Sequence, residues 1–335
     1  MKNTPLSPRP LSRLSGVSVR VLTAAQLRAH GVSAAEVGAR CRAGGPWQQL
    51  LPGVYLLHPG PPTGEELLRA ALLYTGRRGA AANPEGFGEA MITGAAALAL
   101  HGFDSAPPLS ALDRVDVLVP RTRRLRSTGF VRIVRVTHEF PEACEAASLP
   151  VAPVARALAD AVAEPADPPA VRRLLAEAVR GGHCEPTAVV RELSRARLLS
   201  RPHVVDAVDS LLAEGRAMAE DRLYAMVREH GLPDPLWNVD LHLPGGPHLG
   251  GVDAYWPDQA VVVELDTRTP CQDDDEVWSE YTRKREYLER LGITVVHITP
   301  RKLREARDQQ AIVVRTALMA AGDREPAAYV VVLPR

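Results

Sequence analysis

The chain has 335 residues, 46% of them hydrophobic, which is enough for more than one buried core and argues against a disordered protein. Only 4% of the residues are aromatic, so a platform of rings for stacking single-stranded nucleic acid is not expected. Its 40 basic and 40 acidic residues balance, so the overall charge indicates no partner and only local charge is informative.

Cysteine usage and the first residues indicate where the protein resides. The 4 cysteines are far apart and form no CxxC pair, which excludes a zinc knuckle, an iron–sulfur cluster or a redox pair. A disulfide framework would need denser cysteines, so a reducing compartment is expected. No apolar run suits a signal peptide or a membrane helix, so we predict a cytoplasmic protein that contacts no membrane.

Residues 1–60 are predicted to form a winged helix preceded by a basic arm. Residues 1–35 are rich in lysine and arginine and contain no acidic residue, which suits phosphate, although a flexible terminus would look the same. Capping-box patterns beginning at Thr23 and Ser33 predict two short helices with a turn between them. The Pro52-Gly53 turn then predicts a hairpin, which completes the winged helix-turn-helix order.

The second of these helices is the candidate reader of duplex DNA. It would offer Arg40 and Arg42 to the major groove, where an arginine can bind guanine through two hydrogen bonds. A winged helix that contacts only protein is the alternative, and the basic arm favours DNA.

Residues 61–200 are predicted to form a mixed α/β middle region. Predicted helices cover 64–80, 93–101, 151–163, 168–180 and 186–198, and predicted strands cover 116–120 and 130–136. An arginine run with Arg121, Arg123 and Arg124 lies between the two strands. It could bind phosphate or form a solvated hairpin loop.

A third region, residues 201–335, begins at Arg201-Pro202. Its predicted order is a helix over 204–230, strands over 252–256 and 259–265, a helix over 276–291, a strand over 293–298 and a helix over 300–321. A hairpin, a crossover helix and a further strand make a small α/β layer. The whole chain is therefore predicted to be α/β, or α+β overall.

Acidic residues occupy predicted buried positions of this layer. Glu264 and Asp266 are two apart on one strand, so their side chains point the same way, and Asp253 ends the neighbouring strand. Carboxylates on a buried strand need a compensating partner. Mg²⁺ is the obvious candidate, because it prefers carboxylate oxygens.

Two helical residues are predicted to face the same place. Glu220 shares an apolar helix face with Leu223, and Lys284 interrupts an apolar stripe, so both would point toward the sheet. The stripe consists of Val277, Tyr281, Leu288 and Leu291. Acids that hold a metal, with a lysine to stabilise developing charge, make a phosphodiester-hydrolysis site. Alternatively, Glu220 pairs with Arg216 or Arg222 and Lys284 extends to solvent.

Residues 215–321 resemble the Vsr-like branch of the PD-(D/E)XK endonucleases. The resemblance lies in Glu220, residues 231–238, 252–257, 263–266, 283–285 and 292–296. It implies that Asp253 and Glu264 bind the metal with Glu220. The usual E-x-K lysine is replaced by Asp266, which would complete the metal shell, and Lys284 would supply the lysine from a helix.

Residues 20–200 resemble the antitoxins of type IV abortive-infection toxin–antitoxin systems. The resemblance lies in the predicted winged helix and in residues 93–98, 115–120 and 155–160. It implies an autorepressor that binds duplex DNA and neutralises a nucleotidyltransferase-type toxin.

Two functions remain open from the sequence. The first is a DNA-binding protein whose C-terminal domain is a Mg²⁺-dependent endonuclease, with Asp253, Glu264 and Asp266 at the metal and Lys284 and Glu220 catalytic. The second is a non-enzymatic DNA-binding regulator or antitoxin with a degenerate nuclease fold. The first requires the four carboxylates to converge and places the Lys284 nitrogen within about 5 Å of Glu264 or Asp266, where opposite charges stabilise each other.

Overall fold

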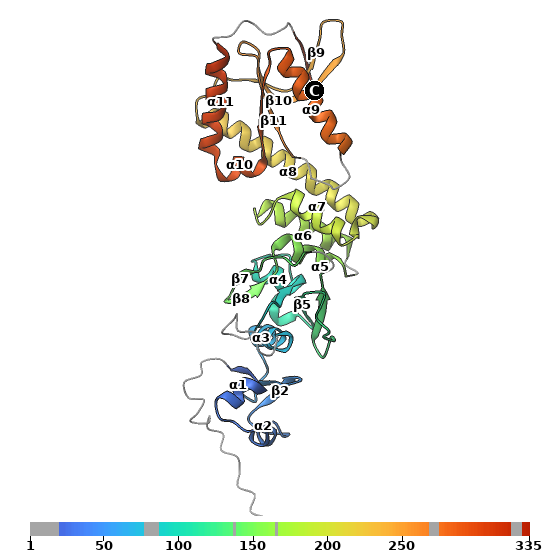
Figure 1. Ribbon diagram of the computed structural model, residues 1–335, viewed down its shortest axis with the longest axis vertical. Helices are drawn as coiled ribbons and strands as arrows, with labels where there is room; N and C mark the ends of the chain where they lie inside the picture. The colour runs from blue at the N-terminus through green and yellow to red at the C-terminus, as the bar shows by residue number, and fades with distance from the viewer. Residues whose placement is uncertain (1–19, 77–86, 137–138, 165–166, 268–274, 323–329) are drawn as a thin grey trace, which may run out of the picture. The chain divides into compact units, whose positions relative to one another are not determined.

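The computed structural model describes residues 20–76, 87–136, 139–164, 167–267, 275–322 and 330–335, with only the backbone course of residues 275–281. The chain is mixed α/β (Figure 1) and divides into two compact units. Unit 1 holds residues 1–177 with 195–198, and unit 2 holds residues 178–194 with 199–335. The predicted basic arm falls largely on residues 1–19, outside the described residues.

Unit 1 begins with two short helices and a small sheet. The elements are β1 (Val21–Thr23), α1 (Ala24–Ala29), α2 (Ala34–Arg40), β2 (Gln48–Leu51) and β3 (Val54–Leu56), and the strands lie in the order β1-β3-β2. Both predicted capping boxes are confirmed, because the side chains of Thr23 and Ser33 each accept a hydrogen bond at the N-terminus of their helix. The predicted hairpin is confirmed as antiparallel β2 and β3.

The rest of unit 1 is a sheet with helices. The elements are α3 (Gly64–Thr75), β4 (Met91–Thr93), α4 (Gly94–Leu100), η2 (Leu109–Ala111), β5 (Val115–Val119), β6 (Val131–Arg135), β7 (Cys144–Ala146), β8 (Leu149–Val151), α5 (Val154–Val162) and α6 (Pro168–Arg180). The strands lie in the order β6-β5-β4-β8-β7. β5 and β6 are parallel, so the loop between them is not the hairpin loop that the sequence suggested.

Contacts join residues 93–98, 115–120 and 155–160 of this region. The Thr93 hydroxyl donates a 2.6 Å hydrogen bond to the buried carboxylate of Asp160. Gly94 lies so close to Asp116 that a Cβ atom there would be 2.7 Å from a carboxylate oxygen. Asp116 in turn forms a 2.6 Å ion pair with Arg132 of β6. Segments far apart in the chain therefore meet at the start of α4.

Unit 2 is a sheet covered by helices on both faces. Its elements are α7 (Pro186–Arg195), η3 (Leu198–Ser200), α8 (Pro202–Glu229), β9 (Leu236–His242), β10 (His248–Trp256), β11 (Val261–Leu265), α9 (Asp275–Arg290), β12 (Thr294–Ile298), α10 (Pro300–Glu305), α11 (Arg307–Gly322) and β13 (Val331–Pro334). The strands lie in the order β12-β11-β10-β9-β13. β9, β10 and β11 are antiparallel, whereas α9 crosses over so that β12 pairs with β11 in parallel.

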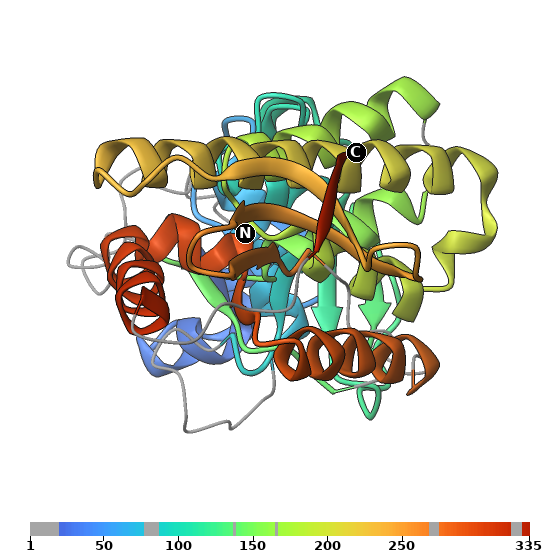
Figure 2. The ribbon, with the colours of Figure 1, turned by 90° about the horizontal axis from the view of Figure 1, so that it is seen from above.

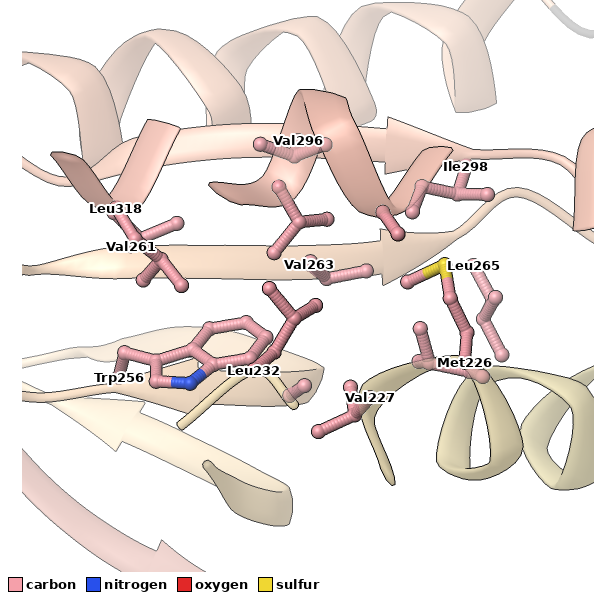
Figure 3. Close-up of a cluster of buried hydrophobic side chains, with 14 of the residues drawn as sticks. Met226, Val227, Leu232, Trp256, Val261, Val263, Leu265, Val296, Ile298 and Leu318 are labelled. Atoms are coloured by element: carbon pink, nitrogen blue, oxygen red, sulfur yellow. The ribbon is translucent and has the colours of Figure 1, made fainter. Parts of the chain in front are cut away.

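Two apolar cores cover the two faces of this sheet. Val261, Val263 and Leu265 pack with α8, α10 and α11 in the first core (Figure 3). Val262 points the other way and packs with Leu288 of α9 in the second core. Figure 2 shows α8 in yellow and α9 in dark orange on opposite sides of the strands. We call these faces the α8 face and the α9 face.

The structure corrects one predicted element of unit 2. The single helix expected over 300–321 is broken at Ala306, whose φ of −143° is not helical, and α10 and α11 result. The break lets Leu303 and Ala311 both reach the core of the α8 face. Within the described part of the chain, no helix is long and apolar enough to cross a membrane.

Candidate functional site

The candidate site lies where β9 and β10 switch faces. Residues two apart on a strand normally share a face, yet Val252 joins the core of the α9 face and Ala254 joins that of the α8 face. The same switch occurs on β9 around Asn238, whose φ of +49° is unusual for a residue other than glycine. Because the side chains of Val252 and Ala254 lie on opposite faces of the sheet, Asp253 between them does not follow the alternation of side chains along β10.

Asp253 is 6% exposed, and both of its carboxylate oxygens are engaged. Oδ2 accepts a 2.6 Å hydrogen bond from the backbone N–H of Leu265, so the carboxylate fills the place where the pairing of β10 with β11 stops. Oδ1 is 2.5 Å from Nη2 of Arg216 on α8. Nε of Arg216 also donates to Glu220 at 2.9 Å. Arg216 thus bridges two acids, as one sequence alternative anticipated for Glu220.

Glu264 is also 6% exposed, and its cation comes from the opposite face of the sheet. Oε1 of Glu264 is buried and contacts the Lys284 ammonium on α9 as an ion pair, without the directed geometry of a hydrogen bond. Lys284 Nζ donates a 2.7 Å hydrogen bond to the carbonyl of Gly251. The predicted closeness of Lys284 to Glu264 is confirmed, and the lysine does not merely extend to solvent.

Two residues missed in the sequence complete the surroundings of Lys284. Gly250 has a φ of +121°, and a Cβ atom there would lie 2.5 Å from Cε of Lys284, so only a glycine leaves room for the lysine stem. His297 on β12 pairs with Glu264 in the sheet, and its Nδ1 is 3.6 Å from Oε2 of Glu264. The closeness of His297 to Glu264 follows from the register between β11 and β12, which the sequence does not show.

Asp266 directly follows the end of β11. Its backbone N–H donates to the carbonyl of Ile298 at 2.9 Å, just beyond the paired ends of β11 and β12. The residue lines a cavity that Arg216 and Thr299 also line. Asp266 is therefore associated with the Arg216 side of the site.

Three of the four predicted metal carboxylates contact cations of the chain itself. Glu220 and Asp253 contact Arg216 of α8, whereas Glu264 contacts Lys284 of α9. Among the described residues, no three acidic, histidine or cysteine side chains form a group able to hold a metal ion. The convergence of the four carboxylates on one Mg²⁺ ion stays a prediction, and such an ion would compete with Arg216 and Lys284 for carboxylate oxygens.

The pKa of Tyr224 is affected by the acidic residues that contact Arg216. Burial raises the pKa of its phenol, and the negative charges of Glu220 and Asp253 raise it further. The hydroxyl accepts a 2.8 Å hydrogen bond from the side-chain amide of Asn238. Burial and, after it, the neighbouring carboxylates therefore favour the protonated phenol, although the hydrogen bond from Asn238 acts in the opposite direction.

Arg40, a predicted DNA contact, has a different role. It is 7% exposed, and its guanidinium lies 5.1 Å from the centre of the Trp47 ring. This stacking makes Arg40 part of the small N-terminal core, so the prediction that it reads bases is corrected. Arg42 follows α2 in a turn and is exposed.

The arginine run forms a supported loop in unit 1. Arg121 and Arg124 are exposed, whereas Arg123 donates a 2.6 Å hydrogen bond to the Thr75 carbonyl at the end of α3. The hydroxyl of Tyr74 donates to the Arg126 carbonyl at 3.0 Å and so holds the loop backbone. Arg123 therefore holds the loop on which Arg121 and Arg124 are exposed to solvent.

Comparison with known proteins leaves the geometry as the guide to function. No protein-family model matches the chain, and no curated protein matches it.

Proposed function

We propose that the protein is a DNA-binding regulator whose second unit has a nuclease-like fold that does not cut DNA. The observation that carries this proposal is the engagement of Asp253 and Glu220 by Arg216 and of Glu264 by Lys284. The positive charge that a metal ion would supply in a nuclease is supplied here by Arg216 and Lys284 of the chain itself.

Binding to duplex DNA is supported by unit 1. The order β1-α1-α2-β2-β3 is that of a winged helix, with Arg42 exposed just after the second helix. Exposed Arg121 and Arg124 lie on a loop whose backbone is held by hydrogen bonds. Little backbone freedom would therefore be lost when the loop contacts phosphates. These arginines would position the duplex rather than read its sequence.

The nuclease-like character of unit 2 is supported by its topology. A long helix, three antiparallel strands, a crossover helix and a parallel strand follow in the order of the PD-(D/E)XK resemblance. Asp253 and Glu264 lie on neighbouring strands of that sheet, as the resemblance implies. A divalent ion would have to displace Arg216 from Asp253, which costs the ion pair between a buried carboxylate and a partly exposed guanidinium.

A metal-dependent endonuclease is the second candidate function. The closeness of Lys284 to Glu264 favours it, because a lysine beside a strand carboxylate can stabilise charge on a phosphoryl group. The type IV antitoxin function, with its nucleotidyltransferase-type partner, stays a prediction from the sequence resemblance.

Two assays on the full chain separate these functions. Binding to a labelled duplex should weaken with salt, and the double variant Arg42→Ala/Arg124→Ala should bind more weakly by at least about tenfold. Arg290→Ala is the matched control, because Arg290 is 77% exposed on α9 of unit 2. Undiminished binding by the double variant would contradict the proposed DNA surface.

Cleavage is tested on supercoiled plasmid with Mg²⁺ or Mn²⁺ and with Glu264→Gln as the control. The regulator function predicts identical, uncut plasmid for both proteins. Metal-dependent nicking by the wild type, lost in Glu264→Gln, would establish the endonuclease instead.

A further inference from the structure

A cavity in unit 2 lies beside the acidic site and shares Arg216 with it. Its volume is about 340 Å³, within the range of small-molecule sites. It lies beyond the carboxyl ends of the parallel strands β11 and β12, where Asp266, Thr267 and Thr299 line it. This end of a parallel pair is where α/β sheets commonly bind ligands.

The walls of the cavity come from two helices that approach each other closely. α7 contributes Pro186 and Ala188, and α8 contributes Leu212 and Gly215. A Cβ atom at position 215 would lie 2.5 Å from a ring carbon of Pro186, so the glycine is what allows this approach. The walls are thus apolar and close together.

Three arginines and two acidic residues line the cavity. The arginines are Arg191, Arg216 and Arg301, accompanied by the hydroxyl-bearing Thr187, Thr267 and Thr299, and the acids are Glu185 and Asp266. Glu185 is paired with Arg304, Arg301 with Glu305, and Arg216 with Glu220 and Asp253, so a phosphate group would find Arg191 and would share the two paired arginines with their carboxylates. Guanidinium groups bind phosphate through paired hydrogen bonds, which makes a phosphate group the best-matched anion.

We propose that this cavity binds a nucleoside phosphate. The phosphate would contact Arg191, Arg301 and Arg216, and the base would pack on the apolar wall formed by Pro186 and Leu212. In a free ribonucleotide, Asp266 would accept hydrogen bonds from the sugar hydroxyls, a role that acidic residues have beside nucleotides at the ends of strands. The 5′-terminal sugar of a DNA strand has no free hydroxyl, so Asp266 would not take this role there. The ligand is either a free nucleotide or the phosphorylated terminal nucleotide of a DNA strand.

Arg216 connects the cavity with the acidic site. The same guanidinium lines the cavity and bridges Asp253 and Glu220. A phosphate that drew Arg216 toward the cavity would leave both carboxylates without their cation. This proposal does not depend on DNA binding by unit 1.

The test is calorimetric titration of the full chain with AMP and, separately, with a short 5′-phosphorylated oligodeoxynucleotide and its unphosphorylated form. We expect a dissociation constant of about 1 mM or tighter for AMP or for the phosphorylated strand. Ala188→Leu would fill the cavity without changing its charge, and Arg191→Gln would remove one cation. Each should weaken binding by at least about tenfold, whereas Arg290→Gln should not change it.

The three arms separate the possible outcomes. Binding of AMP identifies a free nucleotide, and preference for the phosphorylated over the unphosphorylated strand identifies a strand end. Circular dichroism of Ala188→Leu must match that of the wild type, and if it does not, Arg191→Gln alone decides. No binding of either phosphorylated probe, or binding that both variants retain, overturns the proposal.

Discussion

Arg40 shows how burial changes what a charged side chain does. Its guanidinium stacks on Trp47 inside the small core of α1 and α2. We expect Arg40→Ala to lower the free energy of unfolding by about 1–2 kcal/mol, because a desolvated cation–π contact and the packing of the stem are lost. Urea denaturation measures the change.

Arg42→Ala is the control for this prediction. The side chain is exposed, so its removal should change the free energy of unfolding by less than about 0.5 kcal/mol. An Arg40→Ala variant with unchanged stability but weakened DNA binding would show that Arg40 reaches the groove after all.

Lys284 compensates a carboxylate that is almost fully buried. Lys284→Met keeps the stem and leaves Glu264 without its cation, so we expect a loss of about 3–5 kcal/mol in the free energy of unfolding. Adding Glu264→Gln should recover most of that loss, because no buried charge then remains unpaired. Equal stabilities for all three proteins would refute the pairing.

Cys184 is expected to be chemically inert. Burial, assisted by the negative charge of Glu185, raises its pKa to about 12, although the positive charge of Arg304 opposes the shift. Almost none of the thiol is ionised at pH 8, and the thiolate is the reactive form. Alkylation with iodoacetamide followed by peptide mapping should modify exposed Cys144 well before Cys184. Equal labelling of both would contradict this environment.

At the scale of elements, two glycines should respond oppositely to alanine. Gly250 has a φ of +121° and lies against Lys284, so Gly250→Ala should destabilise unit 2 by at least about 1–3 kcal/mol. Gly38 lies inside α2, and a Cβ atom there would have open space for 4 Å around it, so Gly38→Ala should stabilise the helix by about 0.5–1 kcal/mol. Thermal unfolding of both variants checks the two signs.

Local patterns predicted the elements whose causes are local. The capping boxes at Thr23, Ser33 and Thr63 each begin a helix, because a side-chain oxygen three residues away satisfies the first free N–H groups. Lys284 interrupts an apolar stripe, and a lysine in such a place needs a buried acid. Its pairing with Glu264 was therefore predictable.

Features that depend on distant residues were not predictable. The face switch at Asn238 and Asp253 requires two strands to be irregular at the same point, which no periodicity in either strand shows. His297 meets Glu264 only through the register of a parallel pair. Arg40 has the same local pattern whether it faces solvent or Trp47. The expected convergence of four carboxylates depends on distant contacts of the same kind and stays a prediction.

At the scale of the whole molecule, the pairing of Glu220, Asp253 and Glu264 with Arg216 and Lys284 predicts that dissolved metal is unnecessary for folding. Unfolding curves of the full chain should coincide in excess EDTA and in excess MgCl₂, because an ion that bound the native state would raise its stability. Arg216→Ala leaves Glu220 and Asp253 uncompensated, so this variant should be stabilised by Mg²⁺. A wild-type protein that EDTA destabilises would contradict the internal pairing.

The bridge made by Arg216 also bears on how such a protein can evolve. A single codon decides whether two neighbouring acids are satisfied from within or must recruit an ion from the medium. Under the proposed function, a chain that cleaves DNA and one that does not would be separated by very few substitutions, with the sheet and its cores unchanged. The same few substitutions would lead in either direction.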